Sequence, residues 1–341
     1  MQQPKPPLKI KLIAICLIMM VSVVFLEVAV RLIISIPPET VPRHIGQFDE
    51  QLGWSLVPNS YGISTRTGQA VEYRINSKGL RDDETTYAKP DNSYRIVIIG
   101  DSHTFGFGVP MEQHFTQLLE GYFDNVEVIN LGVSGYGVDQ FYWSLEQEGL
   151  KYQPDLVIAV SLGYYGHRHM YTERFDAHKP KFEWDDDDLV VVNRLVKPKY
   201  SQWHELNRDI ADYSQLYKVL AIGIPRLLGL APMRVIVSDL DIKQAKDPVW
   251  MAQVHKTGDK ILLKTRDLAL AHKASFMIVT LDSQIEQAMT AEGITTLNIE
   301  QSLNNPLFRL SADLKHFNEA GNGIVAWLIA QELVTMKNFE N

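Results

Sequence analysis

Cysteine is almost absent from this sequence, because Cys16 is the single one among 341 residues. A lone cysteine can form neither an internal disulfide nor a zinc site built from several thiolates. It lies in an apolar segment, so we interpret it as inert. His167 and His169 stand two residues apart without a third ligand, which favours a surface or pocket role over a metal site. We therefore expect no metal ion and no other cofactor.

Long runs of positive charge are also absent, and the formal net charge is −8. Both observations argue against a nucleic-acid partner, which would need a basic surface. The acidic run from Asp185 to Asp188 invites a calcium site, but it lacks the alternating ligands and central glycine of a calcium-binding loop. We expect a solvated loop there. The 45% hydrophobic content is enough for a packed core and excludes a disordered chain.

Three lysines stand within residues 1–11, and the run from Leu12 to Leu26 holds no charge. Extended to residue 36, this apolar run is long enough to span a bilayer. A cleaved signal peptide is the alternative, but no small-residue cleavage site follows the run. We predict an uncleaved transmembrane anchor over 12–36, with residues 1–11 in the cytoplasm by the positive-inside rule. The rest of the chain then lies in the periplasm or outside the cell.

Residues 37–92 form a mixed, polar segment with turn signals and short alternating stretches such as Val71 to Ile75. Aromatic residues such as Trp54 and Tyr73 require burial, which argues against a disordered stalk. We predict a small β-rich extension that packs on the main domain.

From Tyr94 the sequence alternates between strand and helix patterns, which is typical of a parallel sheet with helices on its faces. We therefore predict an α/β fold, a three-layer sandwich, over residues 93–337. The predicted strands are 95–99, 126–131, 155–161, 275–280 and 294–298, and the predicted helices are 111–123, 138–150, 247–273, 284–292 and 319–336. Residues 167–246 interrupt this alternation. We predict an insertion there, over the carboxyl edge of the sheet, where a substrate lid would lie.

The stretch from Arg95 to Gly106 joins a continuous β-branched strand to the turn Gly100-Asp101-Ser102. A serine at the carboxyl end of a central strand stands where open α/β sheets place their ligands. Ser102 is therefore a candidate nucleophile, although Gly-Asp-Ser is also ordinary turn chemistry. No Gly-x-Ser-x-Gly elbow occurs in this region, which argues against an ordinary α/β-hydrolase.

A serine becomes a nucleophile when a base takes its proton and a third group orients that base. Among ten histidines, His316 stands three residues after Asp313, in a predicted loop before the last helix. Asp313 could fold back to accept the ring N–H, although the two could equally be unrelated surface residues. The helix breakers Gly321 and Gly323 place the first turn of that helix at Ile324.

A second glycine-rich turn follows the next predicted strand, in the stretch from Val128 to Gly137. Its backbone N–H groups, together with that of Ser102, could hold the oxyanion of a tetrahedral intermediate. A plain tight turn and a rival nucleophile at Ser134 are the alternatives. The dinucleotide motif Gly-x-Gly-x-x-Gly is missing here, so the turn does not indicate a nucleotide cofactor.

Together these motifs resemble the SGNH hydrolase superfamily, also called GDSL esterases and lipases. The matching residues are Gly-Asp-Ser after the first strand, Asn-Leu-Gly-Val-Ser-Gly after the second, and Asp-x-x-His before the last helix, in the right order over residues 94–336. The resemblance implies a flavodoxin-like sandwich. It also implies these roles: Ser102 as nucleophile, His316 as base, Asp313 as its orienter and Gly135 as an oxyanion donor.

The parts outside this domain carry a resemblance of their own. The apolar anchor, Gly53-Trp54 and the stretch from Asn76 to Arg81 are similar to segments of membrane-anchored bacterial members of the superfamily. The resemblance therefore implies an anchored protein of the bacterial envelope.

One motif departs from the superfamily pattern. The turn after the third strand should carry Gly-x-Asn-Asp, whose asparagine amide is a third oxyanion donor. With Gly163 aligned to the motif glycine, Tyr165 takes the asparagine position and Gly166 the aspartate position. Losing one oxyanion donor can cost ~3 to 4 kcal/mol of transition-state stabilisation. The hydroxyl of Tyr165 or a residue of the insertion would reduce that cost.

The resemblance implies an extracytoplasmic, membrane-anchored serine ester hydrolase. Its expected partner is an acyl-ester substrate, for example a small acyl group such as acetyl on an envelope or secreted glycan or lipid. An O-acyltransferase that modifies a cell-envelope polysaccharide is one alternative, and it would need a multi-span membrane partner to supply the acyl donor. A catalytically weak binding protein of the same fold is the other alternative.

Overall fold

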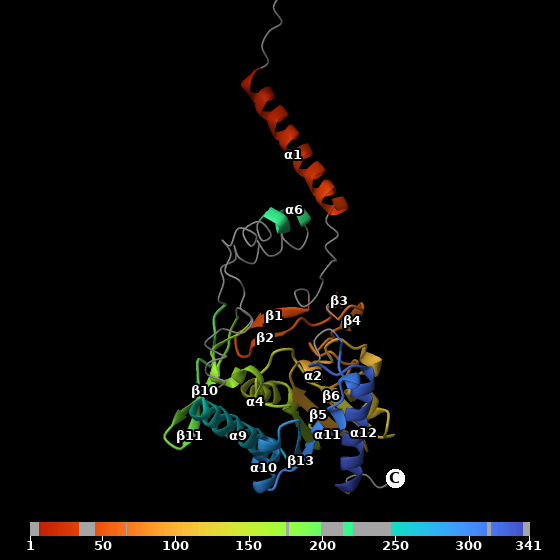
Figure 1. Ribbon diagram of the computed structural model, residues 1–341, viewed down its shortest axis with the longest axis vertical. Helices are drawn as coiled ribbons and strands as arrows, with labels where there is room; N and C mark the ends of the chain where they lie inside the picture. The colour runs from red at the N-terminus through yellow and green to blue at the C-terminus, as the bar shows by residue number, and fades with distance from the viewer. Residues whose placement is uncertain are drawn as a thin grey trace, which may run out of the picture. The chain divides into compact units, whose positions relative to one another are not determined.

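The computed structural model describes residues 7–33, 45–65, 67–174, 177–198, 214–220, 247–311 and 315–336. The chain divides into two compact units, whose helices and strands are labelled in Figure 1. One unit comprises Met1–Pro38 and Tyr200–Ile236, and the other comprises Glu39–Lys199 and Val237–Asn341. The domain boundaries inferred from the sequence stay a prediction.

The first unit contains the apolar helix α1, Leu8–Ile33. At ~1.5 Å per residue this helix is ~39 Å long, which exceeds the ~30 Å hydrocarbon layer of a bilayer. None of its residues is buried against protein. The described residues therefore include a helix long and apolar enough to cross a membrane. It overlaps the anchor predicted over 12–36, of which residues 34–36 lie outside the described part of the chain.

Glu27 of α1 contacts the short helix α6, Gln215–Lys218. Its carboxylate accepts hydrogen bonds from Ser214 Oγ at 2.8 Å and from the backbone N–H groups of Gln215 and Leu216 at 3.0 Å each. These donors satisfy a charge that would be costly in an apolar segment without partners.

The second unit is built on a five-stranded parallel sheet with the strand order β13-β12-β7-β5-β6. The strands are β5 Tyr94–Gly100, β6 Val126–Asn130, β7 Leu156–Val160, β12 Ser275–Thr280 and β13 Thr295–Asn298. The five predicted strands are confirmed, each with its ends within about one residue of the prediction. Because β5 pairs with both β6 and β7, the turns that follow these three strands lie side by side at the carboxyl edge of the sheet.

Helices cover both faces of this sheet (Figure 1), and alternate residues of each strand face opposite layers. Val97 and Ile99 share a core with helices α4 Val138–Gln147, α9 Pro248–Ala271 and α10 Ser283–Ala291. Ile96 and Ile98 share the other core with α3 Phe115–Glu120, α11 Glu300–Leu303 and α12 Glu319–Thr335. Each fully buried Val or Ile contributes about 1.5–3 kcal/mol, which explains the continuous apolar run of β5. The predicted three-layer α/β sandwich is the observed architecture.

The helix predicted over 111–123 is split into a 3₁₀ turn η1, Met111–Gln113, and α3. The break occurs at His114, whose backbone is extended. Its buried ring bonds to Thr116 Oγ1 at 2.8 Å and to the carbonyl of His103 at 2.9 Å, contacts that the hydrophobic pattern does not encode.

The helix predicted over 319–336 is confirmed as α12, Glu319–Thr335, and the separate expectation from its glycines, a first turn at Ile324, was wrong. Asn318 caps the helix by accepting a hydrogen bond from the N–H of Gly321 at 3.0 Å. A side chain at Gly321 would collide with the carbonyl of Phe308, so this glycine allows close packing inside the helix instead of ending it.

The segment before β5 folds into two antiparallel hairpins, β1–β2 and β3–β4. The strands are β1 Gly46–Asp49, β2 Gly53–Leu56, β3 Tyr61–Ser64 and β4 Val71–Arg74. Leu56 and Tyr73 are buried in the core that covers one face of the sheet. This β extension therefore packs on the sheet domain.

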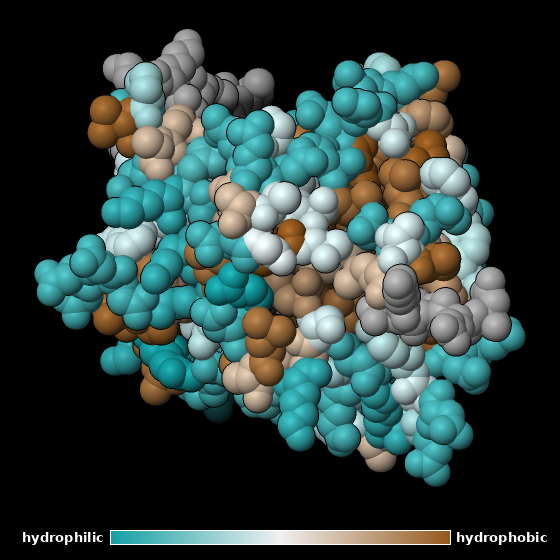
Figure 2. Space-filling model, turned by 90° about the horizontal axis from the view of Figure 1, so that it is seen from below, coloured by the Kyte–Doolittle hydropathy of each residue, from teal (hydrophilic) through white to brown (hydrophobic). Residues whose placement is uncertain are grey.

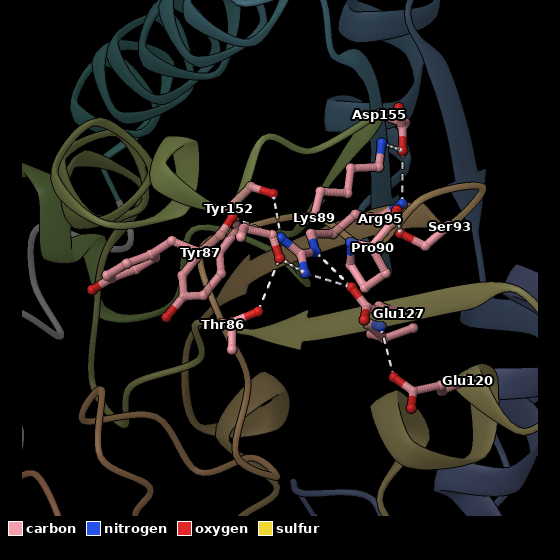
Figure 3. Close-up of polar contacts among 12 residues, drawn as sticks. Thr86, Tyr87, Lys89, Pro90, Ser93, Arg95, Glu120, Glu127, Tyr152 and Asp155 are labelled. Carbon is pink, nitrogen blue, oxygen red and sulfur yellow. Dashed lines mark hydrogen bonds and ion pairs between the residues drawn. The ribbon is translucent and has the colours of Figure 1, made fainter.

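Arg95 joins this extension to the amino end of β5, opposite the carboxyl edge (Figure 3). Its buried guanidinium donates to Glu127 Oε2 at 2.7 Å and to the carbonyls of Tyr87 and Tyr152 at 3.1 and 2.8 Å. The N–H of Arg95 donates to Asp155, which also pairs with a lysine of the preceding segment. These bonds satisfy a buried charge and fix where β5 begins.

Within the 167–246 insertion, residues 173–192 include two hairpins, β8 Glu173–Arg174 with β9 Ala177–His178, and β10 Lys181–Asp185 with β11 Asp188–Val192. The helix α6 also lies within this range. The acidic run is the exposed tip of the second hairpin, as expected of a solvated loop. Residues 199–213 and 221–246 lie outside the described part of the chain, so the lid stays a prediction. From below, the surface is mostly hydrophilic with apolar residues in small patches (Figure 2).

Candidate active site

Ser102 is the first residue of the short helix α2, Ser102–Phe105, which follows β5 after one residue. That residue is Asp101, which caps the helix by accepting a hydrogen bond from the N–H of His103 at 3.0 Å. The first N–H groups of a helix have no partner inside the helix. The backbone N–H of Ser102 is therefore available to a ligand.

Two glycines make this sharp turn from strand to helix sterically allowed. A side chain at Gly100 would collide with Thr104, and one at Gly132 would collide with the backbone of Phe105. Both glycines let α2 fold back onto the ends of β5 and β6. This close packing holds Ser102 at the carboxyl edge of the sheet.

The structure brings Ser102 and His316 together, with 2.8 Å between Ser102 Oγ and His316 Nε2. The ring of His316 stacks on His103, with ring centres 4.7 Å apart and an angle of 28° between the planes. Phe107 packs on the same ring at 4.7 Å. Two aromatic neighbours thus limit the orientations that the His316 ring can adopt.

His103 also ties the loop of His316 to the turn of Ser102. Its Nδ1 lies 3.2 Å from Asp101 Oδ1, and its Nε2 lies 3.2 Å from the carbonyl oxygen of Lys315. One ring therefore contacts the residue before Ser102 and the residue before His316. Asp313, the predicted orienter of His316, lies outside the described residues, and its role stays a prediction.

Gly135 lies in the turn after β6, with a positive φ of 89° that favours glycine. Trp54 of the β extension fixes this turn on both sides. Its Nε1 donates to the carbonyl of Ser134 at 3.1 Å, and its carbonyl accepts the hydroxyl of Tyr136 at 2.7 Å. Gly135 itself is buried. Two serines lie in these turns, Ser102 and Ser134. Within the described part of the chain, His316 bonds to Ser102 and not to Ser134.

Arg81 supports the segment that follows α2. Its buried guanidinium donates to the carbonyls of Phe105, Gly106 and Val109 at 2.6 to 2.8 Å. Burial lowers the pKa of Arg81 to about 10, which leaves it charged at neutral pH. The β extension therefore holds the Ser102 segment through Arg81 and the Gly135 turn through Trp54.

The turn after β7 forms the 3₁₀ helix η3, Tyr165–Met170, and sends Arg168 toward Asp101. Arg168 Nη1 donates to Asp101 Oδ2 at 2.6 Å and to the carbonyl of Tyr136 at 2.9 Å. Burial by itself would raise the pKa of Asp101, but the charge of Arg168 and the hydrogen bonds from His103 bring it well below the usual range. Asp101 is therefore a carboxylate at any pH near neutral.

The superfamily resemblance puts Tyr165 at the position of a third oxyanion donor, and the side chain of Tyr165 lies outside the described part of the structure. His169 in the same turn is buried, with Nε2 3.0 Å from the carbonyl of Val254. Burial lowers the pKa of His169 to about 3, so it is a neutral core residue. His167 Nδ1 accepts a hydrogen bond from Trp250 at 3.0 Å. No group of three metal-ligating side chains occurs among the described residues.

A cavity of about 20 Å³ lies next to this turn, lined by residues that include Asp101, Tyr136, Gly137, Ser161 and Arg168. It has room for about one water molecule.

No protein-family model matches the chain, and none of the curated proteins matches its sequence. Solved structures resemble it. A member of the lipolytic protein G-D-S-L family from Veillonella parvula is 15% identical, with a TM-score of 0.39, covering 71% of this chain and 99% of that one.

Two esterases are similar to the same degree. The psychrotrophic esterase EstA from Pseudoalteromonas is 11% identical with a TM-score of 0.39, covering 73% of this chain and 100% of that one. An acetylxylan esterase from Geobacillus stearothermophilus is 14% identical with a TM-score of 0.40, covering 74% of this chain and 98% of that one.

Sequence reasoning missed His103 and Arg168, and it expected the burial of Trp54 but not its hydrogen bonds to the Gly135 turn. His103 stands beside the candidate serine, and Arg168 lies in the turn that departs from the superfamily pattern. Their positions next to the candidate serine and in the divergent turn are the sequence signals that could have identified them. The contacts of Trp54 join residues 80 positions apart, and no local pattern indicates them.

Proposed function

We propose that this chain is a serine ester hydrolase of the SGNH superfamily, with Ser102 as nucleophile and His316 as general base. The observation that carries the proposal is the 2.8 Å contact between Ser102 Oγ and His316 Nε2. This distance lies within the range needed for direct proton transfer from a hydroxyl to an imidazole. The serine also stands at the carboxyl edge of a parallel sheet, where α/β enzymes bind their ligands.

In the first half of the reaction, Ser102 Oγ attacks the carbonyl carbon of an acyl ester while His316 Nε2 takes the hydroxyl proton. The carbonyl oxygen becomes an oxyanion, for which the backbone N–H groups of Ser102 and Gly135 are the proposed donors. The bond to the alcohol then breaks, and His316 gives its proton to the departing alcohol oxygen. The products of this half are the free alcohol and an acyl-serine.

In the second half, His316 takes a proton from water as the water oxygen attacks the acyl-serine carbonyl. The bond to Ser102 Oγ breaks, His316 returns the proton to this oxygen, and the free acid leaves. Asp313 is the proposed orienter of His316 and would stabilise its charged form. The pair Arg168 and Asp101 takes no proton in this scheme.

The proposed location is the outer side of a membrane. The apolar helix α1 supports an anchor, and the lysines of residues 1–11 support a cytoplasmic amino terminus by the positive-inside rule. A site on the outer side meets esters of the cell envelope, so we propose a short acyl group, such as acetyl, on an envelope or secreted glycan or lipid as the substrate.

The test uses the full-length protein in detergent, with p-nitrophenyl acetate as a small ester probe. The proposal predicts that the wild-type protein hydrolyses the ester and that Ser102→Ala reduces the rate to that of the probe in buffer. Ser134→Ala is the matched control and should keep the wild-type rate. Loss of turnover in Ser134→Ala with turnover retained in Ser102→Ala would contradict the assignment of the nucleophile.

A further inference from the structure

One guanidinium group connects the two turns that carry the proposed oxyanion donors. Arg168 Nη1 donates to Asp101 Oδ2 at 2.6 Å and to the carbonyl oxygen of Tyr136 at 2.9 Å. Asp101 directly precedes Ser102, and Tyr136 directly follows Gly135. The same nitrogen atom therefore contacts a neighbour of each proposed donor.

We propose that Arg168 is a positioning residue that sets the distance between the backbone N–H groups of Ser102 and Gly135. This inference rests on the proposed esterase function. Arg168 acts through Asp101 and Tyr136 and does not itself contact the ester. The proposal assigns to Arg168 a role in transition-state stabilisation, because the two N–H groups must both reach the same developing oxyanion.

The geometry of the contact suits a fixed position. The side chains of Arg168 and Asp101 are 15% and 10% exposed, so the ion pair is shielded from solvent and held more firmly than a surface pair. A guanidinium is planar and keeps its donors in a fixed arrangement, which a flexible ammonium group does not. Replacing Arg168 leaves the Asp101 carboxylate in place without its strongest partner.

Gly137 leaves space for Arg168 to contact both Asp101 and Tyr136, a pair of contacts that we call the Arg168 bridge. A Cβ at Gly137 would lie 2.7 Å from Asp139 Oδ1, 3.0 Å from the Cβ of Arg168 and 3.1 Å from the backbone nitrogen of His169. The close approach of η3 is therefore one of two reasons why this position is a glycine, together with the side chain of Asp139.

The bridge also bears on the missing asparagine. The superfamily resemblance expects a third oxyanion donor from the turn after β7, and this chain uses that turn to supply Arg168. Nη1 donates to two oxygens and Nε is buried, so we assign to Arg168 the placement of the other donors and not a direct contact with the oxyanion. An enzyme with fewer donors depends more on the placement of those it has.

The kinetic test compares wild type, Arg168→Lys and Arg168→Met on the full-length protein with p-nitrophenyl acetate. We expect Arg168→Met to lower kcat by ~30- to 100-fold with KM within ~3-fold of wild type, since displacement by about 1 Å can cost ~100-fold. Arg168→Lys keeps the charge but not the planar group that holds the two N–H bonds of Nη1 in fixed directions, and it should recover less than a third of the wild-type kcat. Adding guanidinium ion at millimolar concentration to Arg168→Ala should raise its kcat.

Arg194→Met is the matched control, because Arg194 pairs with Glu146 on the surface and is 60% exposed. It should keep the wild-type kcat and KM. A kcat of Arg168→Met within twofold of wild type would overturn the proposal. So would a raised KM with unchanged kcat, because that result assigns Arg168 to substrate binding, and so would full activity of Arg168→Lys.

Hydrogen exchange separates this inference from the proposed function. In Arg168→Met the amides of residues 101–106 and 133–137 should exchange faster than in wild type and in Arg194→Met. Unchanged exchange in folded Arg168→Met would overturn the positioning role, even if the wild-type protein is an esterase. Absence of ester turnover by the wild-type protein contradicts the proposed function instead, and the exchange result still reports whether Arg168 holds the two turns together.

Discussion

Ser102 Oγ lies 2.8 Å from His316 Nε2, although 214 positions separate the two residues in the chain. The first residue follows β5, an interior strand of the sheet, and the second precedes the last helix. His103 links the two segments through Asp101 and the carbonyl of Lys315. The contact between serine and histidine is thus maintained by a residue of the nucleophile turn itself.

Arg81→Met should destabilise the protein and lower ester turnover. The substitution leaves the carbonyls of Phe105, Gly106 and Val109 without their buried donor, at about 1–3 kcal/mol for an unsatisfied buried group. The expected loss of unfolding free energy is about 3 kcal/mol, measured by urea denaturation. Turnover should fall because the freed segment includes Phe107, which packs on His316.

Arg74→Met is the control for Arg81, since Arg74 lies in the same extension and pairs with Glu72 at the surface. Exposed pairs contribute little, so its unfolding midpoint should match wild type. Equal stability of the two variants would show that Arg81 does not hold the segment after α2.

Tyr165→Asn should raise turnover. The prediction follows from the superfamily resemblance, in which an asparagine amide at this position is a third oxyanion donor. One added oxyanion donor can raise kcat by ~100-fold. An increase of ~10-fold would already support the alignment of Tyr165 with the motif asparagine. Tyr122→Asn, at an exposed position, is the control. An unchanged or lower kcat in Tyr165→Asn would show that Tyr165 does not simply vacate that position.

Stability should fall in acid partly through His114. Burial, and then the charge of Arg81, lower the pKa of His114 from its ordinary 6.5 to about 3. The unfolded chain therefore binds this proton more tightly, and the free energy of unfolding decreases as pH drops from about 6.5 toward 3. His114→Gln removes this titrating imidazole. The free energy of unfolding should then depend less on pH between about 6.5 and 3, as measured by urea denaturation at several pH values.

The exposed His272 provides the control, because His272→Gln should leave the pH dependence of stability as it is in wild type. A pH dependence in His114→Gln equal to that of wild type would contradict the assignment of this acid sensitivity to His114.

The sheet could be predicted because its strands carry their own signal. Ile96 to Ile99 form a continuous β-branched run, and burial on both faces requires that run. Helix ends were harder, because Gly321 reads as a breaker in sequence and is a packing position against Phe308 in the structure. The sequence cannot tell these two uses of glycine apart, since the second depends on a neighbour distant in the chain.

The residues of the candidate site likewise fall into those that local motifs indicate and those that depend on distant partners. Ser102 and His316 could be proposed from local motifs, and the structure places them in contact. The roles of Arg81, Trp54 and Arg168 depend on hydrogen bonds to backbone carbonyls of other segments. Any residue type offers a carbonyl, so the partners of these side chains leave no pattern in the sequence.

The central claim is that Ser102 is a nucleophile activated by His316. The most direct measurement is covalent labelling of the full-length protein by a fluorophosphonate, followed by mass spectrometry of the modified peptide. The account predicts one label on Ser102, with no labelling of Ser102→Ala and labelling at least ~100-fold slower in His316→Ala. A wild-type protein that stays unlabelled and does not turn over small esters, or a label on Ser134, would contradict it.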